Sequence, residues 1–386
     1  MTDTIIVGGG IAGLTSALAL QRQGRKVRVF EQASRFGEVG AGLTLSQPAT
    51  RGLFSLGLKE AIEKAADIPA RACGADYWTG TRIEGPDLVQ EARDAGDIPY
   101  FYQIHRADMH EILASAVLAN DPDAITLGRQ LCDLSQDETG VTATFVDGST
   151  ERGAVLIGAD GVNSRVRTLL FGEEHPRFTG QVAYRFLVPS TQVEPFMTAG
   201  ASCNYVGPGR SLLRYRIRHG SIVNGVAFVA TDSWTGEGWS TPVETEELLE
   251  QFADVNDDVK GLMAAAPRDG TRKWALFDRD PMPQWTKGRV TLAGDSAHPM
   301  LPFLGLGAAM GIEDAVVLGR AFSADLPVAA ALHVYEETRR ERANAVLLES
   351  RRQGEIRRGE KPPTKHDRSN DFLYTYDPST VELAAV

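Results

Sequence analysis

Three glycines and one acid near the start of the chain have the types and spacing that hold a redox dinucleotide. Gly8, Gly10 and Gly13 directly follow the β-rich run 4–7, and Glu31 ends the next apolar run, 18 residues past Gly13. Glycine at these positions permits a tight turn, leaves room for a pyrophosphate and lets a helix lie close to the strand. The acid is placed to accept ribose hydroxyls and would repel a 2′-phosphate. The pattern therefore predicts a site for FAD or NAD rather than NADP.

Two further glycine–acid turns could complete such a site. A buried-strand pattern leads into Gly158-Ala159-Asp160-Gly161 and again into Gly294-Asp295-Ser296-Ala297-His298-Pro299. Gly305 and Gly307 then precede a helical pattern, which would aim backbone N–H groups and a positive dipole end at an electron-rich group. An Asp-Gly turn by itself is common. The order of all three turns favours a cofactor site.

The spacing of apolar residues predicts the elements that position these turns. The N-terminal motif has the pattern of strand, glycine turn and helix that opens a Rossmann-like unit. Residues 50–66 have helical spacing. Residues 179–281 carry alternating β-type segments, which favours an antiparallel sheet with one helix at 245–252. Opposite charges at helical spacing predict a long helix over 329–359 with a solvated face.

Composition excludes several classes of function. The 386 residues have a net charge of −11, which argues against nucleic acid or an anionic membrane as a partner. No stretch approaches the ~20 apolar residues of a membrane span, and the first strand starts too early for a signal peptide, so we expect a cytoplasmic protein. Cys73, Cys132 and Cys203 are widely spaced. No disulfide framework or zinc site can be read from them, and we expect small buried hydrophobes there.

The three motifs in this order resemble those of the class A flavoprotein aromatic hydroxylases, which include salicylate, 3-hydroxybenzoate, 4-hydroxybenzoate and 6-hydroxynicotinate hydroxylases. The segment 105–110 is similar to the one whose Arg pairs with the FAD pyrophosphate in that family. Gly40-Ala41-Gly42 and the segment 307–315 are most similar to the salicylate hydroxylase branch. The resemblance covers the chain from about residue 4 to 345.

This resemblance implies a mixed α/β fold, in which a Rossmann-like FAD-binding domain carries an inserted antiparallel-sheet substrate domain and a long C-terminal helix. We assign 1–73, 104–178 and 282–330 to the FAD-binding domain, 74–103 and 179–281 to the substrate domain, and 331–386 to the C-terminal helix and tail.

The implied activity is that of an NAD(P)H-consuming monooxygenase that hydroxylates a small aromatic substrate through a C4a-hydroperoxyflavin. FAD would be its cofactor, with NADH or NADPH and O₂ as co-substrates. The Asp-Gly turn would touch both FAD and the nicotinamide nucleotide. The residues expected to bind FAD are Gly8, Gly10, Ala12, Gly13, Glu31, Gln32, Gly42, Thr44, Arg106, Leu131, Asp160, Asp295, Gly307 and Ala308.

We expect the substrate to lie against one face of the sheet. Tyr215 and His219 are candidate bases for a ring hydroxyl, and an arginine could pair with a ring carboxylate. The other expected contacts are Tyr184, Arg185, Tyr205, Arg214 and Pro299. Strand alternation separates Tyr215 from Arg214, so these side chains cannot all face the flavin, and periodicity alone favours solvent-facing arginines.

Three positions depart from the family pattern and leave the substrate open. Gln47-Pro48 stands where Pro-Asn is usual, Leu306 where the branch has Gln, and Ser211 where some members have a substrate-side His. An epoxidising or polyketide-type flavin monooxygenase, a flavin-binding protein without turnover and an NAD-dependent dehydrogenase stay open as alternatives. We expect a monomer or a homodimer.

Overall fold

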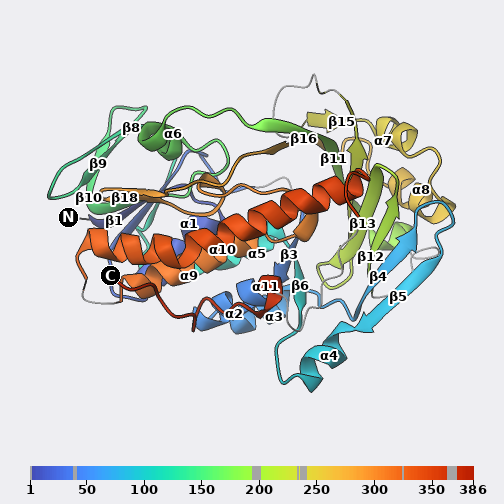
Figure 1. The fold of residues 1–386 in the computed structure, drawn as a ribbon, viewed down its shortest axis with the longest axis horizontal. Coiled ribbons are helices and arrows are strands. Elements are labelled where there is room, and N and C mark those ends of the chain that lie inside the picture. Colours follow the sequence, from blue (N-terminus) through green and yellow to red (C-terminus); the bar gives the residue numbers. More distant parts are fainter. Residues whose placement is uncertain are drawn as a thin grey trace.

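The structure is a computed structural model, and it describes residues 2–37, 41–193, 201–232, 234, 241–323, 326–362 and 372–386. Two large sheets lie side by side, and a long helix runs along both of them (Figure 1). Within the described residues, no helix combines the length and apolar character that a bilayer span requires.

The first sheet brings the three glycine–acid motifs to one edge. Its strands β18, β10, β1, β2 and β7 are neighbours in that order and parallel, and the hairpin of β8 and β9 extends it from β10. Because parallel strands share one carboxyl edge, the turns that follow β1, β10 and β18 meet there. The strands are β1 (Thr2–Val7), β2 (Val27–Glu31), β7 (Ile125–Leu127), β8 (Leu131–Gln136), β9 (Val141–Phe145), β10 (Thr150–Gly158), β17 (Thr286–Lys287) and β18 (Val290–Leu292).

Both faces of this sheet are covered, since the adjacent residues Ile5 and Ile6 of β1 are both fully buried. Helix α1 packs against α9 and α5, and Gly319 of α9 lies close to Ala19 of α1. The helices of this domain are α1 (Ile11–Gln21), α2 (Gln47–Ser55), α3 (Lys59–Ala65), α5 (Arg106–Asn120), α6 (Arg165–Phe171) and α9 (Gly307–Ala321).

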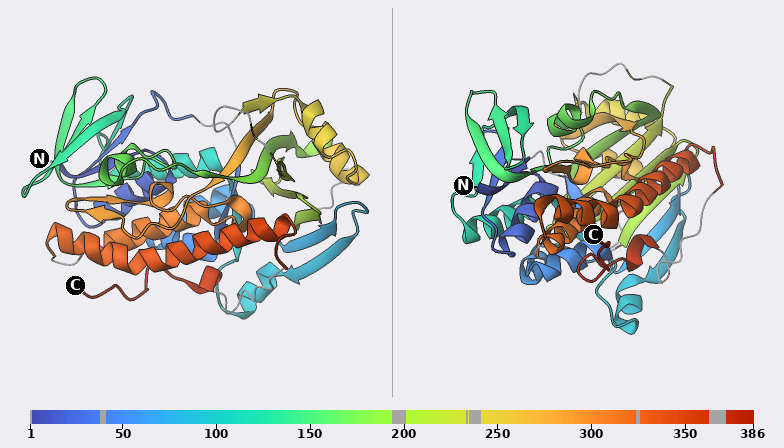
Figure 2. Two further views of the ribbon diagram at one scale, coloured as in Figure 1. Left: turned by 45° about the horizontal axis from the view of Figure 1, so that its top comes forward. Right: turned by 60° about the vertical axis from the view of Figure 1, so that its left-hand side comes forward.

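The second sheet has the strand order β15-β16-β11-β14-β13-β12-β4-β5 and curves away from the first (Figure 2). One face packs beneath α7 (Thr245–Gln251) and α8 (Asp257–Ala264), with Leu248, Phe252 and Leu262 fully buried. The strands are β4 (Arg71–Asp76), β5 (Arg82–Asp87), β11 (Arg177–Pro189), β12 (Ala201–Gly207), β13 (Arg210–Ile217), β14 (Ile222–Ala230), β15 (Thr241–Val243) and β16 (Thr271–Asp278).

The remaining elements connect the two parts. The strands β3 (Gly42–Ser46) and β6 (Phe101–His105) pair with each other, and α4 (Leu88–Asp94) precedes β6. Helix α10 (Val328–Arg357) agrees within two residues with the long helix predicted at 329–359. Beyond it, the short α11 (Phe372–Thr375) returns to the first domain, where Leu373 is fully buried.

The mixed α/β fold is confirmed, but several elements differ from the sequence-based expectation. The single helix predicted over 50–66 is two helices, because Gly57 between them takes a left-handed φ of 74°. Helix α8 was not expected. The second sheet is not wholly antiparallel, since β4 and β12 pair in parallel, and β4 starts at Arg71, before the predicted boundary at residue 74.

Two of the three cysteines are buried, as expected, but they also form a disulfide that could not be read from the sequence. Cys73 of β4 and Cys203 of β12 are register partners with Cα atoms 4.6 Å apart, and the structure joins them in a disulfide. Their separation of 130 residues gave no local signal. Cys132 is a free cysteine.

Candidate active site

The first two glycine–acid turns are in direct contact. Gly8 has a φ of 106°, and a Cβ added there would overlap the carbonyl oxygen of Ala159. Only glycine therefore satisfies both the left-handed backbone and the close approach. Gly13 is similarly close, because its Cβ would overlap the Gly8 carbonyl.

The third turn joins them through side chains. The Ser296 hydroxyl accepts a hydrogen bond from the Gly161 N–H at 2.9 Å and donates one to Asp160 Oδ1 at 3.2 Å. A Cβ added at Gly294 would lie 2.7 Å from the Cβ of Ala12. Ala12 thus packs the first helix against the third turn, and the three motifs form one contiguous site.

The Asp160 carboxylate links the second turn to the third turn and to the start of α6. Besides Ser296, its carboxylate accepts hydrogen bonds from the Ser164 hydroxyl and from the N–H groups of Arg165, at 2.7 Å, and Val166, at 3.1 Å. These bonds cap the start of α6. The carboxylate positions the turn, and its oxygens are largely occupied by this chain.

The N-terminal motif has room for a ligand at its glycine turn. A Cβ added at Gly10 would meet no heavy atom of the described chain within 4 Å. The Glu31 carboxylate accepts hydrogen bonds from the N–H groups of Gly9, at 2.7 Å, and Ala33, at 2.8 Å, which fix it at the end of β2. Gln32 follows with an exposed side chain. Leu131 starts the neighbouring β8 and is buried.

Asp295 is the acid of the third turn. Surrounding protein desolvates the carboxyl and raises its pKa, although His298 and the nearby Arg106 act in the opposite direction. Solvent nevertheless reaches the Asp295 and Arg106 side chains. Gly307 and Ala308, at the partly exposed start of α9, add N–H groups and the helix dipole. An acid, a cation, a helix N-terminus and a glycine cradle fit an extended FAD along this edge.

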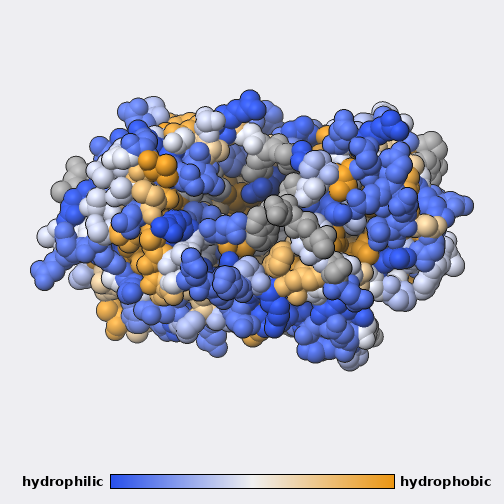
Figure 3. Space-filling model, turned by 90° about the horizontal axis from the view of Figure 1, so that it is seen from above, coloured by the Kyte–Doolittle hydropathy of each residue, from blue (hydrophilic) through white to orange (hydrophobic). Residues whose placement is uncertain are grey.

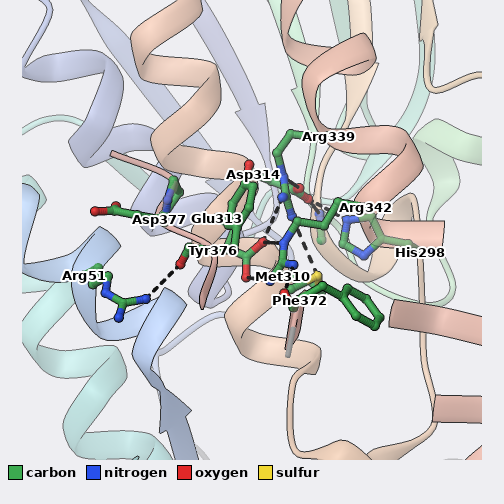
Figure 4. A network of polar contacts seen from close by, with 12 residues as sticks. Arg51, His298, Met310, Glu313, Asp314, Arg339, Arg342, Phe372, Tyr376 and Asp377 are labelled. Atoms are coloured by element: carbon green, nitrogen blue, oxygen red, sulfur yellow. Dashed lines mark hydrogen bonds and ion pairs between the residues drawn. The ribbon is translucent and has the colours of Figure 1, made fainter. Parts of the chain in front are cut away.

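A buried charge network supports the third turn from behind (Figure 4). Asp314 of α9 accepts hydrogen bonds from the Gly294 N–H at 2.8 Å and from Arg339 Nε at 2.9 Å, and it lies 2.6 Å from His298 Nε2. Arg339 also pairs with Glu313 at 2.7 Å. Burial disfavours the charged form of Asp314, but the charges of His298 and Arg339 outweigh it and lower the pKa to about 2.

The C-terminal tail closes over this network. The guanidinium of Arg342 lies 4.0 Å from the ring centroid of Tyr376, and that of Arg339 lies 5.2 Å from it. Arg51 of α2 donates to the backbone carbonyls of Tyr374, at 3.0 Å, and Tyr376, at 3.2 Å.

Tyr215 stands where the second sheet meets the FAD-binding domain. A Cβ added at Gly42 would lie 2.6 Å from the Tyr215 ring and hydroxyl, and the Gly42 N–H donates to Asn224 Oδ1 at 2.8 Å. Burial raises the pKa of Tyr215 to about 12, against the smaller opposing effects of the Arg185 charge and the hydrogen bond with Thr44. The raised pKa favours the neutral hydroxyl, a hydrogen-bond donor, over the phenolate that the predicted role as a base requires.

The sheet face of Tyr215 borders the loop after the third turn. Ala183, Phe228 and Leu276 pack against Leu301, with Phe303 beside them. Pro299, earlier in this loop, is buried. Arg185 is on the same face, with its guanidinium 4.8 Å from the Trp274 ring centroid. The space-filling view shows the surface hollowed near its middle, between the two domains (Figure 3).

Three predicted substrate residues lie on the opposite face. The Tyr184 hydroxyl donates to Glu247 of α7 at 2.9 Å, and Tyr205 is buried beneath α7 and α8. The Arg214 guanidinium lies 5.9 Å from the Tyr205 ring centroid. Because β-strand side chains alternate, these residues cannot share a binding face with Tyr215. Their prediction as substrate contacts does not fit the structure.

His219 is also remote from this face. It occupies the exposed turn between β13 and β14 with a φ of 56°, and its N–H donates to Asp67 Oδ2 at 2.9 Å. It lines a separate cavity of about 200 Å³ with Arg216, which alternates away from Tyr215. A catalytic role for His219 is not supported by this position.

Comparison with known proteins decides the family. A model described as an FAD binding domain matches residues 1–350. A 3-amino-4-hydroxybenzoate 2-monooxygenase of Streptomyces platensis is 38% identical over 352 residues, which cover 90% of this chain and 87% of the relative. The chain belongs to the class A flavoprotein monooxygenases. A 3-hydroxybenzoate 6-hydroxylase of Aquipseudomonas alcaligenes is 33% identical over 90% of this chain and 88% of its own. A solved salicylate hydroxylase in complex with its substrate covers 98% of this chain with a TM-score of 0.80 and 28% identity.

A class A flavoprotein monooxygenase uses FAD, NAD(P)H and O₂, so these predictions are confirmed and a flavin-free NAD-dependent dehydrogenase is set aside. FAD supplies the redox chemistry and the activation of O₂. The edge formed by Gly10, Glu31, Arg106, Asp295 and the start of α9 is where this chain would hold it. The FAD contacts of the individual predicted residues stay predictions.

Sequence reasoning missed residues that this monooxygenase brings to the domain interface. Asn224 was not singled out, and its signal could have been an uncharged polar side chain inside an apolar strand. Arg357, at the end of α10, was assigned to a solvated face, yet its Nη1 donates to the Ser211 hydroxyl at 2.9 Å. Leu306, another of the three positions that depart from the family pattern, is buried in the core.

Proposed function

We propose that the protein hydroxylates a small aromatic ring that carries an electron-donating hydroxyl or amino group, in the manner of a hydroxybenzoate hydroxylase. The relatives named above act on 3-amino-4-hydroxybenzoate and 3-hydroxybenzoate. The observation that carries the proposal is the position of Tyr215, a buried neutral donor that lies against Gly42 at the entry of the FAD-binding domain.

The chain's own residues would perform three tasks. The Tyr215 hydroxyl would hold the ring through its hydroxyl or amino substituent, since bound geometry replaces a bimolecular encounter. The apolar residues Phe228, Leu301 and Phe303 would exclude water from the reacting atoms. The start of α9 would stabilise negative charge that develops on the cofactor.

The test is substrate-dependent consumption of the nicotinamide cofactor. The purified protein, loaded with FAD, is incubated with NADH or NADPH and a panel of hydroxy- and aminobenzoates, hydroxynicotinates and simple phenols. We expect at least one ring to accelerate oxidation and to yield a product 16 mass units heavier. Polycyclic phenols and alkenes are tested as a second set, and if only this set stimulates oxidation, the epoxidising or polyketide-type alternative replaces this proposal.

A protein that binds FAD but oxidises neither nucleotide with any member of the two sets would instead be a flavin-binding protein without turnover. We also propose that the enzyme is cytoplasmic and is a monomer or a homodimer. We propose no nucleic-acid partner, because the net charge of −11 disfavours binding to phosphates. Light scattering of the FAD-loaded protein measures the oligomeric state.

A further inference from the structure

Arg357 occupies an unusual place for a residue at a helix end. It is the last residue of α10, and its Nη1 donates to Ser211 Oγ on the sheet face that also carries Tyr215. Its guanidinium carbon lies 5.3 Å from the ring centroid of Phe303 and 6.0 Å from that of Phe228. A cation at the end of the long helix α10 thus lies between the second sheet and the loop that carries Phe303.

This cation has no acidic partner among the described residues. No carboxylate pairs with it, and its Nε is buried without a hydrogen-bond partner. Other arginines near it on the chain differ, because Arg351 pairs with Asp278 and Asp280 and Arg358 pairs with Glu360. Burial alone lowers the pKa of Arg357 to about 10. A desolvated, unpaired cation is costly, so the site is suited to receiving an anion.

The surroundings suggest which anion fits. Ser211 and Tyr215 lie four residues apart on one face of β13, a span of about 13 Å along the strand. The aromatic side chains Phe228 and Phe303 lie on the Arg357 side of this face. Arg185 is also on this face, and its guanidinium lies against the Trp274 ring. Solvent still reaches part of the Arg357 side chain. A flat ring with a charged group at one end and a hydroxyl or amino group at the other matches this arrangement.

We propose that Arg357 binds the carboxylate of an aromatic acid substrate, with Ser211 holding its guanidinium and Tyr215 at the opposite end of the ring. This assignment rests on the proposed function and deepens it by making the substrate an aromatic acid. It also gives a role to the small residue at 211, since a serine leaves room for the guanidinium that donates to its hydroxyl. Charge-assisted hydrogen bonds of guanidinium to carboxylate are the strong class of such bonds.

The experiment compares acids with their uncharged amides on the FAD-loaded protein. The matched pairs are 3-hydroxybenzoate with 3-hydroxybenzamide, 3-amino-4-hydroxybenzoate with its amide, and 6-hydroxynicotinate with its amide. Binding is read from the change in the flavin absorbance spectrum, which does not depend on turnover. The variants are Arg357→Met, Arg357→Lys and Ser211→Asp, and Arg352→Gln on the same helix is the control.

We expect the unmodified protein to bind at least one acid about 10- to 100-fold more tightly than its amide. Arg357→Met should abolish this preference by weakening acid binding alone, and Arg357→Lys should keep part of it. Ser211→Asp should also abolish it, because the new carboxylate would pair with Arg357. Because Ser211→Asp supplies a counter-ion to the buried cation, it tests the proposal even if Arg357→Met does not fold. Arg352→Gln should behave like the unmodified protein.

Other results overturn the assignment. If Arg357→Met and Ser211→Asp keep the preference for acids, or weaken acid and amide equally, Arg357 does not bind the carboxylate. If Arg357→Met instead raises only the KM for NADH or NADPH, its anion is a phosphate of the nicotinamide nucleotide. If the unmodified protein hydroxylates rings without preferring any acid over its amide, the proposed function stands and this inference fails. If it binds and hydroxylates no aromatic compound, the proposed function fails as well.

Discussion

The imidazole of His298 and the carboxylate of Asp314 lie 2.6 Å apart, and both side chains are almost completely buried behind the third glycine–acid turn. The same carboxylate accepts the Gly294 N–H at 2.8 Å and the Arg339 Nε at 2.9 Å. One side chain of α9 therefore fixes both the backbone and the histidine of the turn that carries Asp295. It has no access to the cofactor site itself and acts by positioning.

Replacing Asp314 by Asn should weaken FAD binding without touching an FAD contact. The amide cannot accept hydrogen bonds from His298, Gly294 and Arg339 together. It also removes one of the two carboxylates that pair with Arg339, so that only Glu313 is left. Breaking a buried ion pair costs about 3–5 kcal/mol, so we expect the free energy of unfolding to fall by roughly this amount and the FAD dissociation constant to rise at least about tenfold. Urea unfolding and flavin fluorescence titration measure the two quantities. Glu341→Gln, at an exposed site on α10, is the control, and an unchanged FAD affinity in Asp314→Asn would refute the positioning role.

The stability of the protein should depend on Asp314 in acid. Its folded pKa of about 2 is below the unfolded value of about 3.9. A depressed carboxyl pKa stabilises the folded state fully above the unfolded pKa, and this contribution is lost as the pH falls through the folded pKa. We expect Asp314 to contribute about 2–3 kcal/mol that disappears between about pH 4 and pH 2. Urea unfolding across this range should show a steeper loss for the unmodified protein than for Asp314→Asn. If the free energy of unfolding falls equally with pH in both proteins, the pKa of Asp314 is not depressed in the folded state.

We expect a glycine at position 10 to be needed for ligand binding and not for folding. Its φ of −78° suits alanine, and the added Cβ would meet no atom of the described chain within 4 Å. Gly10→Ala should therefore change the melting temperature of the FAD-free protein little, yet raise the FAD dissociation constant by about 10- to 100-fold, because the methyl group would occupy space that a pyrophosphate needs. Gly13→Ala should instead destabilise the FAD-free protein, since its Cβ would overlap the Gly8 carbonyl. Normal FAD affinity in Gly10→Ala would place the pyrophosphate elsewhere.

The parts of this site that follow from local pattern could be predicted from the sequence. Each motif is a strand that ends in a glycine turn, and because β18, β10 and β1 are parallel neighbours, their ends meet at one edge. The long helix α10 could be predicted from charge spacing. The break at Gly57 could not, because glycine is tolerated within helices and only the observed φ shows the turn.

The face that each strand turns toward the cofactor depends on pairing between distant segments. The alternation of side chains along β13 predicted that Tyr215 and Arg214 lie on opposite faces. It could not predict that Tyr184 and Tyr205 lie on the face covered by α7 and α8. Arg357 reaches Ser211 across 146 residues of sequence. The charges around it gave the same helical pattern as a solvated face, so the sequence held no signal for its burial.

The disulfide can be tested by counting thiols. Cys73 and Cys203 are register partners on neighbouring strands, and Cys132 is the third cysteine of the chain. Protein that is purified without reductant and denatured should react with one equivalent of a thiol reagent, and reduction should raise this to three. Three equivalents before reduction would show that the pair is not bonded in the isolated protein. Cys132→Ser is the control, because it should lower both values by one.

Tyr215 should act as a hydrogen-bond donor and not as a base. With a pKa of about 12 its hydroxyl is neutral at pH 7–9, so it can bind a ring substituent but cannot take a proton from it. Tyr215→Phe should lower kcat/KM for the aromatic substrate by about 10- to 100-fold, with FAD affinity nearly unchanged. Tyr205→Phe, on the same sheet but beneath α7 and α8, should leave kcat/KM close to normal. The deciding measurement is the pH profile of kcat/KM from pH 6 to 10. The profiles of the unmodified protein and of Tyr215→Phe should have the same shape. If the unmodified protein shows an ionisation below pH 10 that is lost only in Tyr215→Phe, Tyr215 acts as a base.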